Sequence, residues 1–190
     1  MGARRLDVAD VTWSIGETST LVVKAVRGAG QPWGIAEEAG WAMQWLARAN
    51  QPGVAAFARA IEAGNLRALH AGLRVADCRI FPGSLGPIDG LLLAVPFVAR
   101  CVPSGRVWQL QTDSGDFRLW TDGCTRVPNG TTLHKTGEAD LQGIQALSDT
   151  RVPDDPSAFQ ILNKFAARTY APATEASRVS GAGAGLTDND

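Results

Sequence analysis

The sequence is poor in the residues that build the best-known small-protein sites. Only three cysteines occur among its 190 residues, they form no CxxC pair, and only two histidines are present. A disulfide-rich secreted scaffold is therefore excluded, and the thiols are typical of idle cysteines in a reducing compartment. No zinc-ligand spacing and no GxSxG motif is found, so the sequence indicates neither a metal site nor a cofactor.

The sequence also lacks a large excess of positive or negative charge, and it lacks long apolar runs. Eighteen Lys and Arg residues face nineteen Asp and Glu residues, and no basic stripe is present. Binding to nucleic acid by bulk electrostatics is therefore not expected. The most apolar stretch, IDGLLLAVPFVARCV, is shorter than the ~20 residues that span a membrane and is broken by Pro96. The start of the chain lacks the apolar segment of a secretory signal. We therefore expect a cytoplasmic protein that contacts no membrane.

Helices are predicted for the first third of the chain. Ser14 and Glu17 have the spacing of a capping box, which predicts a helix from there to about Arg27. Gly28 and Gly30 end it, and this glycine turn lacks the context of a phosphate-binding loop. A second helix is expected from Pro32 or Trp33 to Ala49. A third, VAAFARAIEAG, follows, and LRALHAG adds one further turn.

The pattern then changes to extended segments. LRVADCRIF is predicted to be a strand, DGLLLAVPFVARCV a helix kinked at Pro96, and RVWQLQT with DFRLWTD a hairpin. A closing helix over 155–170 is favoured because Asp155 can cap it and Pro156 fits its first turn.

This order predicts an α+β fold in which a small antiparallel sheet carries helices on one side. We expect one domain over 1–180, with a helical part at 14–72, a strand-rich part at 73–149 and the closing helix packing back. A separate N-terminal helical subdomain is the alternative. Residues 181–190 form a glycine-rich tail.

The second helix carries an unusual face. On a helical projection, Ile35, Ala39 and Leu46 mark a core stripe, whereas Trp41 and Trp45 stand among charges on the opposite side, which should be wet. Exposed tryptophans usually have a cover. Three covers are considered: another part of this chain, which we favour, a partner subunit, or a small ligand.

Two segments resemble a known family. KAVRGAGQPWGIAEEAGWAMQWL near the start and ARTYAPATEASRVSGAGAGLTDND at the end are similar to the hallmark segments of an uncharacterised bacterial family, a domain of unknown function. The resemblance implies a soluble protein in bacterial small-molecule metabolism. It implies no reaction, cofactor or catalytic residue.

The hallmark segments hold the candidate ligand- or partner-binding residues. These are Arg27, Trp33, Glu37, Glu38, Trp41, Trp45, Tyr170, Thr174, Glu175 and Arg178. We expect the tail to fold back onto the first hallmark segment, over Trp41 and Trp45.

Two functions remain open. The favoured hypothesis is a soluble accessory subunit that binds a second copy of itself or a partner enzyme subunit, because no convincing catalytic constellation is present. The competing hypothesis is an enzyme or binding protein for a small acidic metabolite. Its site would be built from Arg27, Trp33, Glu37, Tyr170, Glu175 and Arg178. Whether the protein is an enzyme stays open.

Overall fold

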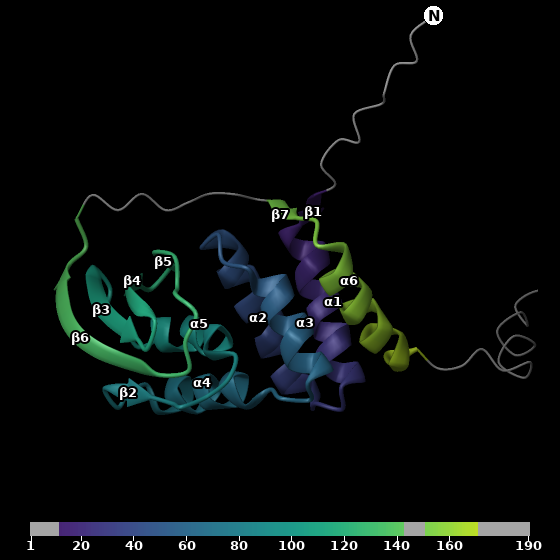
Figure 1. Ribbon diagram of the computed structural model, residues 1–190, viewed down its shortest axis with the longest axis horizontal. Helices are drawn as coiled ribbons and strands as arrows, with labels where there is room; N and C mark the ends of the chain where they lie inside the picture. The colour runs from purple at the N-terminus through teal and green to yellow at the C-terminus, as the bar shows by residue number, and fades with distance from the viewer. Residues whose placement is uncertain (1–11, 143–150, 171–190) are drawn as a thin grey trace, which may run out of the picture.

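The computed structural model describes residues 12–142 and 151–170, which form a helical bundle beside an antiparallel sheet (Figure 1). The bundle contains α1 (Ile15–Gly28), α2 (Trp33–Arg48), α3 (Gly53–Glu62) and α6 (Pro156–Ala166). Helix α5 (Val95–Ala99) stands between bundle and sheet, α4 (Arg67–Cys78) runs along the lower edge in Figure 1, and the 3-10 turn η1 (Leu91–Leu93) precedes α5. A last 3-10 turn, η2 (Ala167–Thr169), follows α6. The predicted α+β fold is confirmed.

Two sheets are present in the described residues, and both are antiparallel. The larger has the order β2-β6-β3-β4-β5. Its strands are β2 (Ser84–Leu85), β3 (Arg106–Thr112), β4 (Gly115–Trp120), β5 (Gly123–Cys124) and β6 (Leu133–Asp140). The smaller sheet pairs β1 (Thr12–Ser14) with β7 (Arg151–Pro153), so that Trp13 lies opposite Val152. This short pairing joins the start of α1 to the start of α6.

Local sequence explains both of these helix starts. The Ser14 hydroxyl accepts a hydrogen bond from the Glu17 N–H, and the Glu17 side chain accepts one from the Ser14 N–H, which completes the predicted capping box. Asp155 accepts from the Ala158 N–H at 3.1 Å, and Pro156 follows it in the first turn of α6. The predicted helices here are confirmed, and the closing helix packs back as predicted, with α1 and α3 as its partners.

The predicted hairpin is also confirmed. Side chains of β3 alternate between buried and exposed from Trp108 to Thr112, as a strand with one covered face requires. Trp108 pairs with Leu119 and Thr112 pairs with Gly115 across the turn. Gly115 has φ +151°, a conformation that other residues rarely adopt. The hairpin forms the centre of the larger sheet.

Two sequence predictions in the middle of the chain are wrong. The segment LRVADCRIF was predicted to be a strand, but most of it continues α4, whose buried side includes Ala68, Leu69 and Val75. A Cβ on Gly72 would lie 2.8 Å from the Ala94 Cα, so glycine lets α4 approach the segment before α5. Pro96 does not kink a helix, because it lies in the first turn of the short α5.

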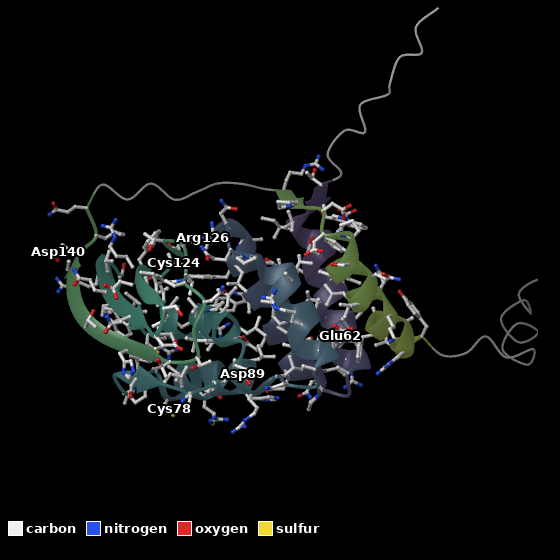
Figure 2. The ribbon with its side chains drawn as sticks, viewed as in Figure 1. Glu62, Cys78, Asp89, Cys124, Arg126 and Asp140 are labelled. Carbon is white, nitrogen blue, oxygen red and sulfur yellow. The ribbon has the colours of Figure 1, made fainter. Side chains whose placement is uncertain are left out.

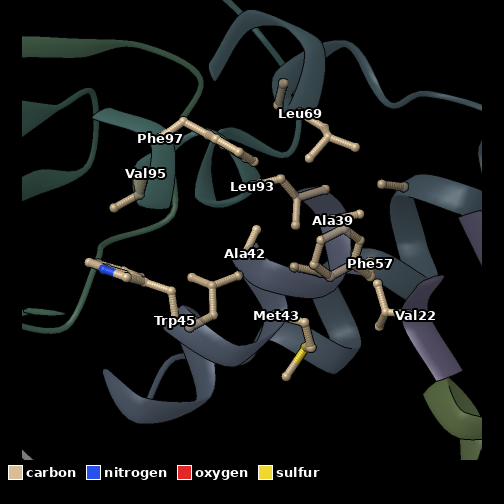
Figure 3. Close-up of a cluster of buried hydrophobic side chains, with 14 of the residues drawn as sticks. Val22, Ala39, Ala42, Met43, Trp45, Phe57, Leu69, Leu93, Val95 and Phe97 are labelled. Atoms are coloured by element: carbon tan, nitrogen blue, oxygen red, sulfur yellow. The ribbon is translucent and has the colours of Figure 1, made fainter. Parts of the chain in front are cut away.

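One continuous core joins the bundle to the elements beside the sheet. Phe57 of α3 and Met43 of α2 are almost fully buried, as are Leu93 of η1 and Phe97 of α5. Figure 3 shows these side chains converging on α2. Helix α2 therefore has covered faces on two sides, toward α1 and toward α5. None of the helices in the described residues is both long and apolar enough to cross a bilayer.

Candidate functional site

Trp41 is covered by α5. Its ring centroid lies 5.5 Å from that of Phe97, and the Arg100 guanidinium lies 3.7 Å from the centre of the Trp41 ring. Arg100 also donates a 2.7 Å hydrogen bond to the Glu38 carboxylate, which completes an ion pair at the surface. Glu38, Trp41, Phe97 and Arg100 thus form one packed cluster, and a cation over a ring of this kind stabilises by about 0.5–1 kcal/mol.

Trp45 is a core residue and not a surface residue. Only 6% of it is exposed, and its Nε1–H donates a 3.0 Å hydrogen bond to the Thr121 carbonyl in the turn after β4. The expectation that this face of α2 is wet is therefore wrong for Trp45. A single amphipathic helix has one covered side, but α2 lies between α1 and the α5–β5 region and is covered on both.

Both rings are covered by other parts of the same chain, which is the alternative that we favour. The covering segments are not the tail that the sequence analysis expects over Trp41 and Trp45. The cover is made by α5 and the turn after β4, whereas α6 packs on α1 and α3. The fold-back of the tail over these rings concerns residues 171–190, which lie outside the described residues. That part stays a prediction.

A second group of candidate residues gathers at the end of α1. Trp33, the first residue of α2, is 60% exposed, and the Arg27 guanidinium lies 5.0 Å from the centre of its ring. Arg27 also donates a hydrogen bond to the Gln31 carbonyl. Gly30 has φ +89°, which turns the chain from α1 into α2 as predicted. The turn and the guanidinium together hold an exposed indole in place.

Tyr170 is held in a similar way by the same helix. It is 63% exposed, its hydroxyl accepts a 3.0 Å hydrogen bond from the Lys24 ammonium, and that ammonium lies 5.3 Å from the centre of its ring. Lys24 and Arg27 are three residues apart, so they share one side of α1. Each of these two cations therefore holds one exposed aromatic ring.

Because α1 packs closely on α6, the rings of Trp33 and Tyr170 lie on one surface. A Cβ on Gly28 would lie 1.8 Å from the Phe165 carbonyl oxygen and 3.4 Å from the Arg168 Cβ. The Arg168 guanidinium lies 4.0 Å from the centre of the Phe165 ring. We call Lys24, Arg27, Trp33, Arg168 and Tyr170 the cationic–aromatic end. The structure thus brings parts of both hallmark segments together.

A groove runs along α1 and α6 next to this end. It has a volume of about 620 Å³, and Lys24 and Tyr170 lie at one of its edges with Ala166 and Ala167. Thr20 and Leu21 of α1 line it farther along. The groove is large enough for several side chains of a partner or for a small molecule.

The predicted candidates therefore divide between two places. Arg27, Trp33 and Tyr170 are at the cationic–aromatic end, and Glu37 is exposed on α2 one turn beyond Trp33. Glu38, Trp41 and Trp45 face α5 and the sheet. Thr174, Glu175 and Arg178 lie outside the described residues.

Sequence reasoning missed Lys24, Arg168, Phe97 and Arg100. Lys24 stands one turn before Arg27, and this spacing could have indicated it. Arg168 stands within the second hallmark segment, two residues before Tyr170. Phe97 and Arg100 have no local signal, because they meet α2 only in the folded chain.

Two of the cysteines in the described part of the chain have thiols that are not activated as nucleophiles. Cys124 is buried in β5, and burial raises its pKa to about 12, so the thiol stays protonated at neutral pH. Burial also raises the pKa of Cys101. The His70 Nε2 lies 3.0 Å from the Gln31 Oε1, near the turn into α2. The described residues contain no group of three or more His, Cys, Asp or Glu side chains that could hold a metal.

Comparison with known proteins supports the resemblance. Residues 13–83 match the model of a family described as a protein of unknown function, DUF3726. The match runs from β1 through α4 and contains the first hallmark segment. It confirms the resemblance to an uncharacterised domain-of-unknown-function family. No curated protein and no solved structure matches the chain.

Proposed function

We propose that this protein is an accessory subunit that binds a partner protein through the cationic–aromatic end. The observation that carries the proposal is the state of Trp33 and Tyr170. Both rings are more than half exposed, and each is held by a cation of α1. A cation over an exposed ring stabilises the fold by only about 0.5–1 kcal/mol, so stability alone explains little of why two such rings are held on one surface.

Interface energetics support this use of the two rings. Trp, Tyr and Arg are the residues that most often dominate the binding energy of protein interfaces. Rings that are already ordered lose little conformational entropy when a partner docks, so more of the contact energy contributes to affinity. The groove beside Tyr170 offers room for a side chain of the partner. The partner surface that fits has an apolar pocket for Trp33 with carboxylates around it.

The proposal also includes the kind of cell and process in which the protein works. The family resemblance supports a role in bacterial small-molecule metabolism, and the partner would then be an enzyme subunit in the cytoplasm. A second copy of this chain is the other partner considered. Light scattering after size exclusion separates the two, because self-association gives an assembly with this chain alone.

Substitution of Trp33 by alanine tests the proposal. The full chain, immobilised, captures proteins from cells that produce it, and the captured protein is purified for titration calorimetry. We expect Trp33→Ala to raise the Kd at least about 30-fold, which corresponds to a loss of ~2 kcal/mol. Ile80→Ala is the matched control, because Ile80 is 70% exposed and lies outside this end.

Three results would contradict the proposal. The first is a partner that binds Trp33→Ala and the wild-type chain equally. The second is a loss of binding in Ile80→Ala as large as in Trp33→Ala, because the effect would then not belong to this surface. The third is a strict monomer that captures nothing.

A small acidic metabolite is the second candidate for the same surface. The observation in its favour is that Lys24 lines the groove, and that two further cations, Arg27 and Arg168, belong to the adjacent cationic–aromatic end. A thermal-shift screen with di- and tricarboxylates tests it. A ligand at ~100 times its Kd stabilises the fold by ~2.7 kcal/mol, so a true ligand raises the melting temperature.

A further inference from the structure

A different part of the molecule contains a hollow that neither proposed function uses. It lies between α3, Asn65 at the turn after α3, the Asp89–Leu92 segment and residues 127–130, and has a volume of about 400 Å³. A smaller hollow of about 230 Å³ adjoins it and shares Asn65 and Asp89. Small-molecule sites have volumes of this order, with mostly apolar walls and a few convergent polar groups.

Hydrogen bonds donated by backbone N–H groups to two side chains fix the wall made by residues 127–130. The amide of Gln51, which is only 8% exposed, accepts from the Val127 N–H at 3.1 Å. At the other end, Asp113 accepts from the Thr131 N–H at 2.8 Å, and this bond is the main cause of the lowered pKa of that carboxyl. The Ile88 N–H donates to the Thr131 carbonyl at 2.8 Å. The hollow is therefore formed before any ligand arrives.

Two opposite charges line this hollow without neutralising each other. Arg59 is exposed on α3, and Asp89 is exposed just before η1, at the lower edge of the molecule in Figure 2. Among the described residues, neither of them forms an ion pair. Between them the walls are largely apolar, with Ala56, Leu91 and Val127 among the lining residues. Arg59 is close enough to Asp155 to contribute to the lowered pKa of that carboxyl, but without a salt bridge both Arg59 and Asp89 can bind groups of one ligand.

We infer that this hollow binds a zwitterionic small molecule with an apolar body, of the amino-acid class. Asp89 accepts from its ammonium, Arg59 donates to its carboxylate, and the apolar walls enclose its side chain. A purely anionic or purely cationic ligand would leave one of the two charges unused. Asn65, which lines both hollows, has an amide that can donate to the same carboxylate.

Titration calorimetry with four probes tests the inference on the full chain. The probes are L-phenylalanine, 3-phenylpropionate without the ammonium, 2-phenylethylamine without the carboxylate, and glycine without the apolar body. We expect L-phenylalanine to bind at least about tenfold more tightly than each of the others, because each lacks one contact worth a charged hydrogen bond or a buried ring.

Substitutions assign the contacts. Asp89→Asn is expected to weaken L-phenylalanine and 2-phenylethylamine at least about tenfold and to leave 3-phenylpropionate unchanged. Arg59→Gln is expected to weaken L-phenylalanine and 3-phenylpropionate and to leave 2-phenylethylamine unchanged. Arg74→Gln and Asp77→Asn, exposed residues of α4 that line neither hollow, are the controls.

The inference is overturned if L-phenylalanine at millimolar concentration gives no binding heat, or if 3-phenylpropionate binds the wild-type chain equally well. It is also overturned if the control substitutions weaken binding as much as Asp89→Asn and Arg59→Gln. Because the four probes are compared on the wild-type chain first, the test does not depend on the variants folding. Trp33→Ala must leave these affinities unchanged, which separates this site from the cationic–aromatic end.

Discussion

At the residue scale, glycine decides how closely the helices approach at the cationic–aromatic end. Gly28 has the backbone of α6 where its side chain would be, whereas Gly34 in the first turn of α2 has open space at the same position. One glycine is therefore required by packing and the other is not. The sequence alone shows both as members of the same glycine-rich stretch.

The two glycines are predicted to respond to alanine in opposite directions. Gly28→Ala should lower the free energy of unfolding by about 1–3 kcal/mol, because α6 must move away from α1. Gly34→Ala should be neutral or stabilise by up to about 1 kcal/mol, because alanine favours the helix. Urea unfolding of both variants measures this. Equal effects of one sign would show that the contact of Gly28 with Phe165 does not limit helix packing.

Single residues also mark where sequence reasoning could not reach. Arg27 and Trp33 are close in sequence, so their pairing could be expected from the turn between them. Glu38 and Arg100 are 62 residues apart, and Trp45 and Thr121 are 76 apart. No local pattern connects such pairs. The cover of Trp41 and Trp45 therefore became visible only in the folded chain.

At the element scale, the predicted elements that proved correct have either explicit start signals, as α1 and α6 do, or a continuous helical pattern without a capping side chain, as α2 and α3 do. The starts of α1 and α6 are specified by capping side chains, and the hairpin by alternation around a turn. For α4, Leu73 and Val75 alternate with polar neighbours and fit a strand as well as a helix. Gly72 lets α4 lie close to Ala94, and this close packing favours the helix. Because Ala94 belongs to a later segment, the local sequence does not show this contact.

The two capped helices are predicted to be sensitive to acid. Hydrogen bonds from Ser14 lower the pKa of Glu17, and the Ala158 N–H lowers that of Asp155. Because both folded-state pKa values lie below the unfolded ones, 4.5 and 3.8, the unfolded state binds more protons in acid. The contribution is complete above about pH 5 and is lost as the pH falls through the folded-state values.

Urea midpoints measured from about pH 7 to about pH 3 check this expectation. The double variant Glu17→Gln/Asp155→Asn keeps hydrogen-bonding side chains at both caps but removes their titration. Its midpoint should fall less steeply with acid than that of the wild-type chain. An unchanged slope would assign the acid sensitivity to other carboxylates, such as Asp113 or Glu138.

At the scale of the whole molecule, the family match covers only part of the packed unit. Residues 13–83 include α1 to α4. The partners of these helices come later in the chain: β7 pairs with β1, α6 packs on α1, and α5 packs on α2 and α4. The core passes through the boundary of the match without a break.

A fragment of residues 13–83 is therefore predicted not to fold alone. The fragment lacks α5 and α6, against which its helices pack, so circular dichroism should show little helix. It also lacks the segments that cover Trp41 and Trp45, so tryptophan emission should be that of exposed rings. The full chain is the control. A fragment that unfolds cooperatively would favour the N-terminal helical subdomain over the single domain predicted for 1–180. That choice remains a prediction until this measurement.

The pairing of β1 with β7 has an electrostatic consequence. Because it places the starts of α1 and α6 together, the two helices run in the same direction and end together at the cationic–aromatic end. Each helix end carries the equivalent of about half a negative charge from its aligned peptide dipoles. The negative ends of the two helices therefore offset part of the positive charge of Lys24, Arg27 and Arg168. The surface offers less net positive potential than its cations suggest, which favours a partner held by ring contacts over an anion held by charge.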